Sequence, residues 1–582
     1  MAMADLPLHL LFIPLLLIAI PLLYFRRRST RGLRLPPSPW ALPVIGHIHH
    51  LAVAGALPHC AMRDLARRLG PLMLLRLGEL PVLIASSADA ARDIMRTNDL
   101  TFATRPIGPM AKVLLGEDSY GIVFAPYGDG WRQLRRICTM ELFSARRVRS
   151  FRAVREEEVR RLLRSVAASA ASASASPVNL SEMISAYVAD ASVRAIIGSR
   201  FRDRETFLRL LERRLKNVPA QSLPELFPSS RLAMLISSTP RLLRSQREEM
   251  MAFIDTIIQE HQENRAAGDD EDLLDVLLRI QREDELDPPL TTENIKSVII
   301  DIFGASSETS ATTLQWIMAE LMRNPSVMRK AQDEVRHVLA GLEIVTEDNL
   351  SGLRYLPLVI KEALRLHPPA PLLIPRESRS PCRVLGFDVP AGVMVLVNAW
   401  AIGRDPSSWE APEEFMPERF ENSDVDFKGT DFEFIPFGAG RRMCPGIGFG
   451  LANMDLALAC LLYHFDWELP DGMEPGELDM TEKLGITTRR LSDLLLVPTV
   501  RVPPFSVDFK GTDFEFIQFG AGRWMCPGIG FGLANMDLTL ASLLLCHFDW
   551  ALPDMTEALG ITTRRLSRLV LVPSVRVPLR GE

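Results

Sequence analysis

The chain has 582 residues, of which 47% are hydrophobic, and a formal net charge of −6. This mild acidity comes without a basic stripe, so it argues against nucleic acid as a partner. The seven cysteines are scattered and form no close pairs of zinc-ligand spacing, which argues against a zinc cluster and fits a reducing compartment. Length alone allows several domains, yet nothing in the composition marks a boundary.

The N-terminal segment at residues 6–25 is almost wholly apolar, and three arginines from Arg26 to Arg28 follow it directly. About 20 such residues span a bilayer, and basic residues stay on the cytosolic side. We therefore expect a transmembrane anchor with the rest of the chain in the cytosol. A cleaved signal peptide fits less well, because the charges follow the apolar run and no small-residue cleavage site is evident. Residues 26–46 are basic and proline-rich, which predicts a stiff hinge.

Three further segments in the first half carry local signals. Residues 72–86 predict early strands, and the Ala/Ser tract at 165–176 predicts a surface loop or a frayed helix end. Residues 223–228 and 232–236 are apolar and lie between helical stretches. They either dip into a membrane beside a substrate entrance or belong to the buried core.

Two predicted helices carry polar residues in unusual places. Trp131 and Arg135 follow a Gly-Asp-Gly turn, and their spacing places them on one helix face. A longer helix at 294–322 carries a run of Ser and Thr that includes Glu308 and Thr309. Because Ser and Thr compete for backbone carbonyls, this run can open the helix locally.

A charged pair and two further arginines follow in the chain. Glu362 and Arg365 are three residues apart on a helix predicted at 358–366, so their side chains share a face. Most such pairs are solvated surface bridges of small energetic value. Arg376 follows a proline-rich segment, and Arg419 lies in a Pro-Glu-Arg-Phe sequence.

The stretch from Phe437 to Gly446 places Cys444 at a glycine-rich turn before a predicted helix. A cysteine binds a metal only as its thiolate, which helix N-termini and neighbouring N–H donors stabilise. Pro445 suits the first turn of that helix. Arg442, two residues before the cysteine, has a guanidinium that can pair with a carboxylate on a bound cofactor.

Glycines around the cysteine allow a bulky, flat group to come close. Gly440 permits backbone angles closed to other residues, and Gly446 and Gly450 leave space beside the backbone. Two other interpretations stay open from these residues alone. Cys444 can be a buried structural cysteine, and the glycines from 446 to 450 with Asp466 can form a dinucleotide loop, although no clean βαβ unit surrounds them.

Together these motifs resemble the cytochrome P450 family, and residues 35–503 are most similar to its plant microsomal A-type monooxygenases. The family pattern Phe-x-x-Gly-x-Arg-x-Cys-x-Gly is matched at every fixed position between Phe437 and Gly446. The resemblance implies the cytochrome P450 fold, which is mainly α with a small β-region, behind an N-terminal transmembrane anchor. We expect the catalytic domain at residues 47–503.

The resemblance also implies roles for individual residues. It implies heme b as the cofactor, with the thiolate of Cys444 as axial iron ligand. The other implied cofactor-binding residues are Trp131, Arg135, Arg376, Phe437 and Arg442. A buried structural triad is implied for Glu362, Arg365 and Arg419.

Glu308 and Thr309 are the implied catalytic residues, because an acid and an alcohol at these positions supply the protons for cleavage of the dioxygen O–O bond. The family pattern has glycine where this chain has Ser306. Serine is small, and the acid and the alcohol remain, so we expect function to survive this departure.

Residues 425–503 reappear at 507–578 nearly unchanged, with a short stretch missing after Asp554. This is a single duplication, since a solenoid needs several shorter units. The second copy keeps Cys526 but has Trp524 where the first has Arg442. One haem needs one axial thiolate, so we expect Cys444 to be the ligand and the second copy to be a partial duplicate; a faulty gene model is the alternative.

The expected function is a haem-thiolate monooxygenase of the endoplasmic reticulum membrane, with a single span and a cytosolic catalytic domain. Its expected partners are NADPH-cytochrome P450 reductase, membrane lipid and a small lipophilic substrate. A terpenoid is favoured on family breadth, and a phenylpropanoid, a flavonoid or an indole-derived compound is also compatible. The alternatives are a catalytically inactive haem-binding duplication product and a nicotinamide-dependent oxidoreductase.

Overall fold

The computed structural model describes residues 32–502 except for 53–56, 117–120, 171–176, 199–203, 217–221, 264–270, 284–285, 343, 484 and 486. Beyond residue 502 it describes four short strands. The expected anchor at 6–25, the first residues of the hinge and Cys526 lie outside the described residues. The chain divides into two compact units, Met1–Pro504 and Phe505–Glu582.

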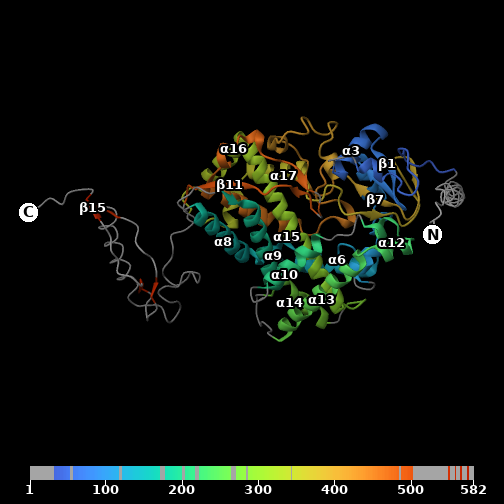
Figure 1. Ribbon diagram of the computed structural model, residues 1–582, viewed down its shortest axis with the longest axis horizontal. Helices are drawn as coiled ribbons and strands as arrows, with labels where there is room; N and C mark the ends of the chain where they lie inside the picture. Colours follow the sequence, from blue (N-terminus) through green and yellow to red (C-terminus); the bar gives the residue numbers. More distant parts are fainter. Residues whose placement is uncertain are drawn as a thin grey trace, which may run out of the picture. The chain divides into compact units, whose positions relative to one another are not determined.

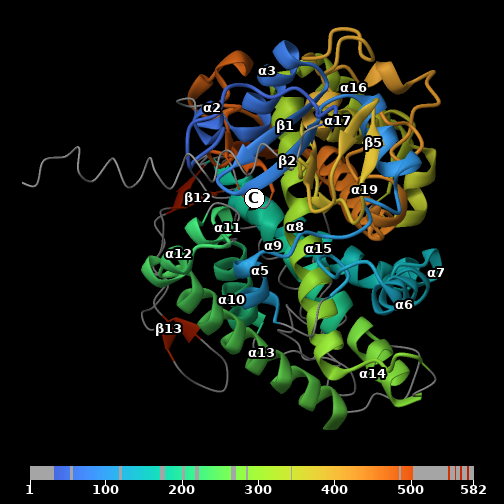
Figure 2. The ribbon, with the colours of Figure 1, turned by 90° about the vertical axis from the view of Figure 1, so that its right-hand side faces the viewer.

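The first unit is built around helix α15 (Thr292–Arg323), which runs through the middle of the helical region in both views (Figures 1 and 2). Its side chains are buried on most sides, as expected for a helix in the core of a large domain. Thr291 caps its N-terminus through a capping box with Asn294. Helix α15 packs most extensively against α9 (Leu180–Ile197).

Further helices surround this centre. Those with an α-helical hydrogen-bond pattern are α2 (Ile48–Leu51), α3 (Pro58–Leu69), α4 (Ala88–Arg92), α5 (Pro109–Leu115), α6 (Asp129–Ile137), α7 (Ala145–Ser150), α8 (Arg152–Ala170), α10 (Arg204–Lys216), α11 (Leu223–Leu226), α12 (Arg231–Ile236), α13 (Thr239–Glu263), α14 (Leu273–Glu283), α16 (Pro325–Val338), α17 (Tyr355–Leu366), α18 (Ala399–Ile402) and α19 (Ile447–His464). Short 3-10 and π-helical turns are η1 (Asp93–Thr97), η2 (Cys138–Leu142), η3 (Glu347–Gly352), η4 (Pro417–Phe420), η5 (Gly440–Arg442), η6 (Pro470–Gly472) and η7 (Pro475–Glu477).

The strands of the first unit form small sheets. The largest has the order β1-β2-β7-β4, with β1 antiparallel to β2, β2 parallel to β7 and β7 antiparallel to β4. A second sheet has the order β3-β11-β8, and two hairpins pair β5 with β6 and β9 with β10. The strand bounds are β1 (Leu72–Leu77), β2 (Leu80–Ala85), β3 (Val178–Asn179), β4 (Arg376–Glu377), β5 (Cys382–Val384), β6 (Phe387–Val389), β7 (Met394–Val397), β8 (Phe465–Glu468), β9 (Glu482–Lys483), β10 (Arg489–Arg490) and β11 (Leu495–Val500).

Most sequence-based elements are confirmed. Strands β1 and β2 lie within 72–86, α17 covers 358–366, and α15 extends the expected 294–322 by a few residues at its ends. The Ser/Thr run does not open α15, however. Thr309 donates to the carbonyl of Ala305 (2.8 Å) and Thr313 to that of Thr309 (2.9 Å), so the hydroxyls bond within an unbroken helix.

The apolar segment at 223–236 forms α11 and α12 on the surface. Leu232, Leu235 and Ile236 are 65%, 81% and 65% exposed. The buried-core alternative is therefore wrong for α12. Among the described helices, α19 is long and apolar enough to cross a membrane, but 67% of it is buried inside the protein, which is typical of a core helix.

The second unit contains two described hairpins, which pair β12 (Phe548–Trp550) with β15 (Pro573–Val575) and β13 (Glu557–Ala558) with β14 (Arg564–Arg565). Phe548 lies opposite Val575, as Phe465 lies opposite Val500 in the first unit. The other hairpin likewise pairs Glu557 with Arg565, as Glu482 pairs with Arg490. The strands of the repeat therefore keep the register of their counterparts.

Candidate functional site

The Cys444 loop is closed by backbone hydrogen bonds and shaped by glycines. The N–H of Cys444 donates to the carbonyl of Phe437 (3.0 Å). Gly438 and Gly440 have φ of 70° and 67°, in the left-handed region that favours glycine. A Cβ at Gly440 would also collide with the carbonyl of Met95. These features hold the cysteine in one backbone position.

The Cys444 sulfur is accessible although protein surrounds it. The residue is exposed, whereas burial raises the pKa of its thiol, opposed by a hydrogen bond from the Gly446 N–H and by the charge of Arg135. A sulfur that faces inward into the protein combines these properties. Helix α19 begins at Ile447 with Gly446 as its N-cap, so the expected place of Pro445 in the first helical turn is wrong.

The arginines predicted to bind a cofactor lie around this loop. Arg135, on α6, donates to the carbonyl of Met443 (2.5 Å). Arg376, on β4, donates to the carbonyl of Ala439 (2.6 Å). Residues far apart in sequence thus bring cations to the loop that carries Cys444, and each is oriented by a carbonyl of that loop.

Arg442 is buried and held by the opposite wall. It donates to the carbonyls of Ala103 (2.6 Å) and Ala125 (2.5 Å). Its guanidinium carbon lies 4.0 Å from the centre of the Trp131 ring, which is within cation–π distance. The indole N–H of Trp131 itself donates to the carbonyl of Ile122 (3.0 Å).

Arg105 is a fourth cation of this group, which the sequence analysis did not identify. It donates to the carbonyls of Ile374 (2.7 Å), Pro375 (2.8 Å) and Val123 (3.0 Å). No motif surrounds it, and its partners are distant in sequence. The one available signal is an arginine that comes shortly after Phe102 and directly before Pro106.

The charge of the four-arginine cluster Arg105, Arg135, Arg376 and Arg442 is not balanced. Burial lowers the pKa of Arg442 to about 9, with added repulsion from Arg376 and Arg135, and burial lowers the pKa of the other three. Among the described residues only Asp99 forms an ion pair with the cluster, at 3.3 Å from Arg376. Because buried charges need partners, the cluster fits an anionic group bound beside Cys444.

A cytochrome P450 family model matches residues 36–496. The chain belongs to the cytochrome P450 family. Desmethyl-deoxy-podophyllotoxin synthase of Sinopodophyllum hexandrum is 49% identical over 84% of this chain and 96% of its own length. Dolabradiene monooxygenase of Zea mays is 49% identical over 81% of this chain and 94% of its own length. Premnaspirodiene oxygenase of Hyoscyamus muticus is 43% identical over 82% of this chain and 95% of its own length.

Solved structures agree on the fold. A zebra fish cytochrome P450 with abiraterone has a TM-score of 0.65 at 24% identity, and the match covers 76% of this chain and 99% of that one. The P450 is therefore a haem-dependent monooxygenase with thiolate-bound iron. The residues around Cys444 fit haem. The accessible cysteine matches the iron, and the surplus of buried guanidiniums matches the two propionates.

Glu362, Arg365 and Arg419 meet in the interior of this P450. Glu362 and Arg365 are 0% and 1% exposed, and two hydrogen bonds of 2.7 and 2.8 Å join them. Arg419 donates to the same carboxylate (3.0 Å). Arg365 also donates to the carbonyls of Gly403 (2.6 Å) and Pro412 (2.7 Å). The surface-bridge interpretation of the pair is wrong, because three chain segments bury it.

Helix α15 presents Ala305 and Thr309 on a partly open face, since Ala305 is exposed and Thr309 half-buried. Glu308 accepts a hydrogen bond from Thr487 (3.1 Å). Ser306, where the family pattern has glycine, turns its hydroxyl back towards the carbonyl of Phe303 (3.4 Å). Its extra side chain is therefore engaged with its own helix.

The dinucleotide interpretation of the glycines is wrong. Gly448 and Gly450 lie inside α19, whereas a dinucleotide loop joins a strand to a helix. A Cβ on Gly450 would lie 3.4 Å from the Ser310 hydroxyl, so α19 comes close to α15 at this residue. Asp466 pairs with Arg336 (2.6 Å).

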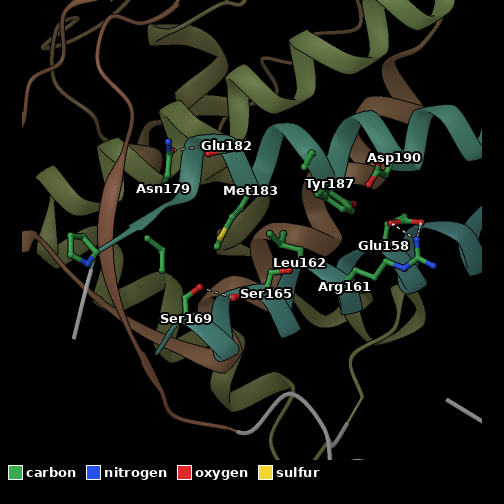
Figure 3. A pocket seen from close by; sticks show the side chains of 13 residues that line it. Glu158, Arg161, Leu162, Ser165, Ser169, Asn179, Glu182, Met183, Tyr187 and Asp190 are labelled. Atoms are coloured by element: carbon green, nitrogen blue, oxygen red, sulfur yellow. Dashed lines mark hydrogen bonds and ion pairs between the residues drawn. The ribbon is translucent and has the colours of Figure 1, made fainter. Parts of the chain in front are cut away.

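A cavity of about 760 Å³ lies elsewhere, between α8 and α9 (Figure 3). Leu162, Met183 and Tyr187 line its apolar side, and Glu158 and Arg161 form an ion pair at one end. No predicted site residue lines it. This cavity therefore lies apart from the accessible sulfur and its cations.

Proposed function

We propose that this P450 inserts one oxygen atom from O2 into a small lipophilic specialised metabolite, with electrons from NADPH delivered by NADPH-cytochrome P450 reductase. A terpenoid is the favoured substrate class. Relatives named for dolabradiene and premnaspirodiene support this class. A phenylpropanoid, a flavonoid or an indole-derived compound is the alternative.

The observation that carries the proposal is the accessible Cys444 sulfur beside three buried guanidiniums and the half-buried one of Arg135, with one carboxylate among them. In the proposal Cys444 ligates the iron, and Arg135, Arg376, Arg442 and the newly identified Arg105 bind the propionates. Haem bound there would supply the activation of dioxygen. Trp131 and Phe437 would complete the walls of the haem site.

The two polar residues of α15 would handle protons. Glu308 is half-buried and can exchange protons with solvent-accessible groups, and Thr309 lies one residue further along the same helix. An acid and an alcohol so placed can deliver protons to reacting oxygen while the surrounding helix excludes bulk water. Glu362, Arg365 and Arg419 would hold the core without touching the reaction.

The proposed location is the endoplasmic reticulum membrane, with one N-terminal span and a cytosolic catalytic domain. The exposed apolar residues Leu232, Leu235 and Ile236 of α12 support a second contact with lipid, because soluble surfaces rarely group such residues. A lipophilic substrate dissolved in the bilayer would then meet the enzyme at this surface.

The first test is the reduced carbon-monoxide difference spectrum of membranes containing the native chain, Cys444→Ala or Cys526→Ala. We expect a red-shifted thiolate-type Soret band that disappears only in Cys444→Ala. Loss only in Cys526→Ala would assign the iron to the second copy, and absence of the band in the native chain would contradict haem-thiolate binding.

The second test separates turnover from inert haem binding. The native chain, reconstituted with reductase, is supplied with NADPH and a panel of sesquiterpene and diterpene hydrocarbons. We expect oxygenated product that contains one atom from labelled O2. A normal carbon-monoxide spectrum without NADPH consumption would instead support the catalytically inactive alternative.

A further inference from the structure

Thr487 lies between β9 and β10 and is 2% exposed. Its hydroxyl donates to a Glu308 carboxylate oxygen (3.1 Å) and lies 3.4 Å from the hydroxyl of Thr312. An ionised carboxylate only accepts hydrogen bonds. When Glu308 is ionised, Thr487 uses its single proton towards that carboxylate, and the Thr312 hydroxyl donates to Thr487.

Helix geometry makes Thr487 a bridge. Glu308 and Thr312 are four residues apart on α15, so their side chains lie on one face, one turn from each other. Thr487 reaches both from a separate segment of the chain. Among the residues that the structure describes, it is the hydrogen-bond donor found for the Glu308 side chain.

The residue that follows Thr487 is held by two hydrogen bonds through its backbone. The neighbouring Thr488 donates through its N–H to the carbonyl of Pro369 (2.9 Å), and its carbonyl accepts from the indole of Trp316 (3.0 Å). Trp316 lies on α15, two turns beyond Glu308. Thr488 is thus tied to the helix that carries the acid, and this contact lies next to the hydrogen bond from Thr487 to Glu308.

We propose that Thr487 is a positioning residue that holds the Glu308 carboxylate in the orientation needed for proton delivery. This inference rests on the proposed role of Glu308. A half-buried glutamate side chain has several conformations of similar energy. Only one of them places the carboxylate for proton delivery. A fixed hydroxyl selects one of them, so the acid is in place before a proton is needed.

The test compares Thr487→Val, which removes the hydroxyl at nearly constant shape, with Thr487→Ser, which keeps it. Thr488→Val is a matched control, because the Thr488 hydroxyl is buried and has no hydrogen-bond partner among the residues that the structure describes. All variants are full-length and reconstituted with reductase. The carbon-monoxide spectrum of each must match the native chain, which shows that haem and fold are retained.

We expect Thr487→Val to slow NADPH oxidation about three- to tenfold, the loss that one hydrogen bond represents, and to enlarge the solvent deuterium isotope effect on that rate. Thr487→Ser and Thr488→Val should stay within about twofold of the native rate. A crystal structure of Thr487→Val should show the Glu308 side chain displaced, and that of Thr487→Ser should show it in place.

Glu308→Gln separates this inference from the proposed function. If Glu308→Gln slows the reaction and Thr487→Val adds nothing to it in the double variant, the coupling is confirmed. If Glu308→Gln slows the reaction but Thr487→Val does not, or if Thr487→Val acts equally in both backgrounds, only the role of Thr487 is overturned. An unchanged rate in Glu308→Gln overturns the proposed role of Glu308 and, with it, the role of Thr487.

Discussion

The guanidinium carbon of Arg442 lies 4.0 Å from the centre of the Trp131 indole ring. The same guanidinium donates to the carbonyls of Ala103 and Ala125, which precede α6 in the chain. The side chain thereby joins the cysteine loop to the wall opposite. The same position in the repeated segment is Trp524. The two copies of the loop therefore differ at the residue that connects the loop to the rest of the site.

Arg442→Trp, which reproduces the second copy in the first, should weaken haem retention about tenfold or more. It removes a charge-assisted donor and leaves the carbonyls of Ala103 and Ala125 without it. Haem per protein after gel filtration measures the effect. Trp524→Arg is the reciprocal control and should leave haem content at the native level. A gain of a second haem in that control would contradict the assignment to Cys444.

Glu362→Gln should lower the free energy of unfolding by about 3 kcal/mol or more, because it leaves two buried guanidiniums without their carboxylate. Urea titration followed by loss of the carbon-monoxide band measures it. Glu249→Gln is the control, since the Arg213–Glu249 pair is about half exposed and such pairs contribute less than about 1 kcal/mol. Equal effects of the two changes would contradict a buried structural triad.

The pair of His261 and Asp272 should make stability depend on pH. Burial lowers the pKa of His261, but the hydrogen bond and charge of Asp272 outweigh it and raise the pKa to about 9, with Asp275 adding to the same direction. The stabilisation is fully present below about pH 6.5, the unfolded value, and is lost as pH rises through 9.

His261→Gln should remove this dependence. We expect the native chain to lose up to about 3 kcal/mol between pH 6.5 and 9.5 relative to the variant. Urea unfolding at both pH values measures the difference. Parallel pH profiles in the two proteins would show that His261 is not protonated in the folded state.

The exposed apolar face of α12 should bind lipid. In a chain shortened to begin at Gly32, replacing Leu232, Leu235 and Ile236 by Gln should lower the fraction bound to phosphatidylcholine vesicles about tenfold or more, because each buried side chain contributes about 1.5–3 kcal/mol. Vesicle flotation measures binding. Met140→Gln, at a residue 62% exposed on η2, is the control. Equal binding of all three proteins would contradict a lipid contact at α12.

Local patterns in the sequence predicted the elements and residues whose partners are near in the chain. The spacing of Glu362 and Arg365 was sufficient because three residues bring side chains together on any helix. Helix α19 began two residues later than expected, since Gly446 has non-helical angles of −90° and 14°. A proline marks a helix start only to within a turn.

Contacts between distant segments were not predictable. Arg105 is held by carbonyls about 270 residues away, and Thr487 meets Glu308 across 179 residues. No periodicity records such pairs, so only the folded chain reveals them. The Ser/Thr run of α15 was a local pattern that led to a wrong prediction. Such residues can open a helix, but here the hydroxyls bond to carbonyls of the same helix and α15 stays unbroken.

The repeated strands keep their register, but the residues before them do not keep their phase. Phe465 follows Asp455 by 10 residues, whereas Phe548 follows Asp537 by 11. One extra residue rotates a helix by about 100° relative to whatever follows it. The sequence before Phe548 therefore cannot replace the sequence before Phe465 without changing the phase between the apolar face of α19 and the strand β8. The first copy is thus the one whose spacing fits both α19 and β8, independent of Arg442.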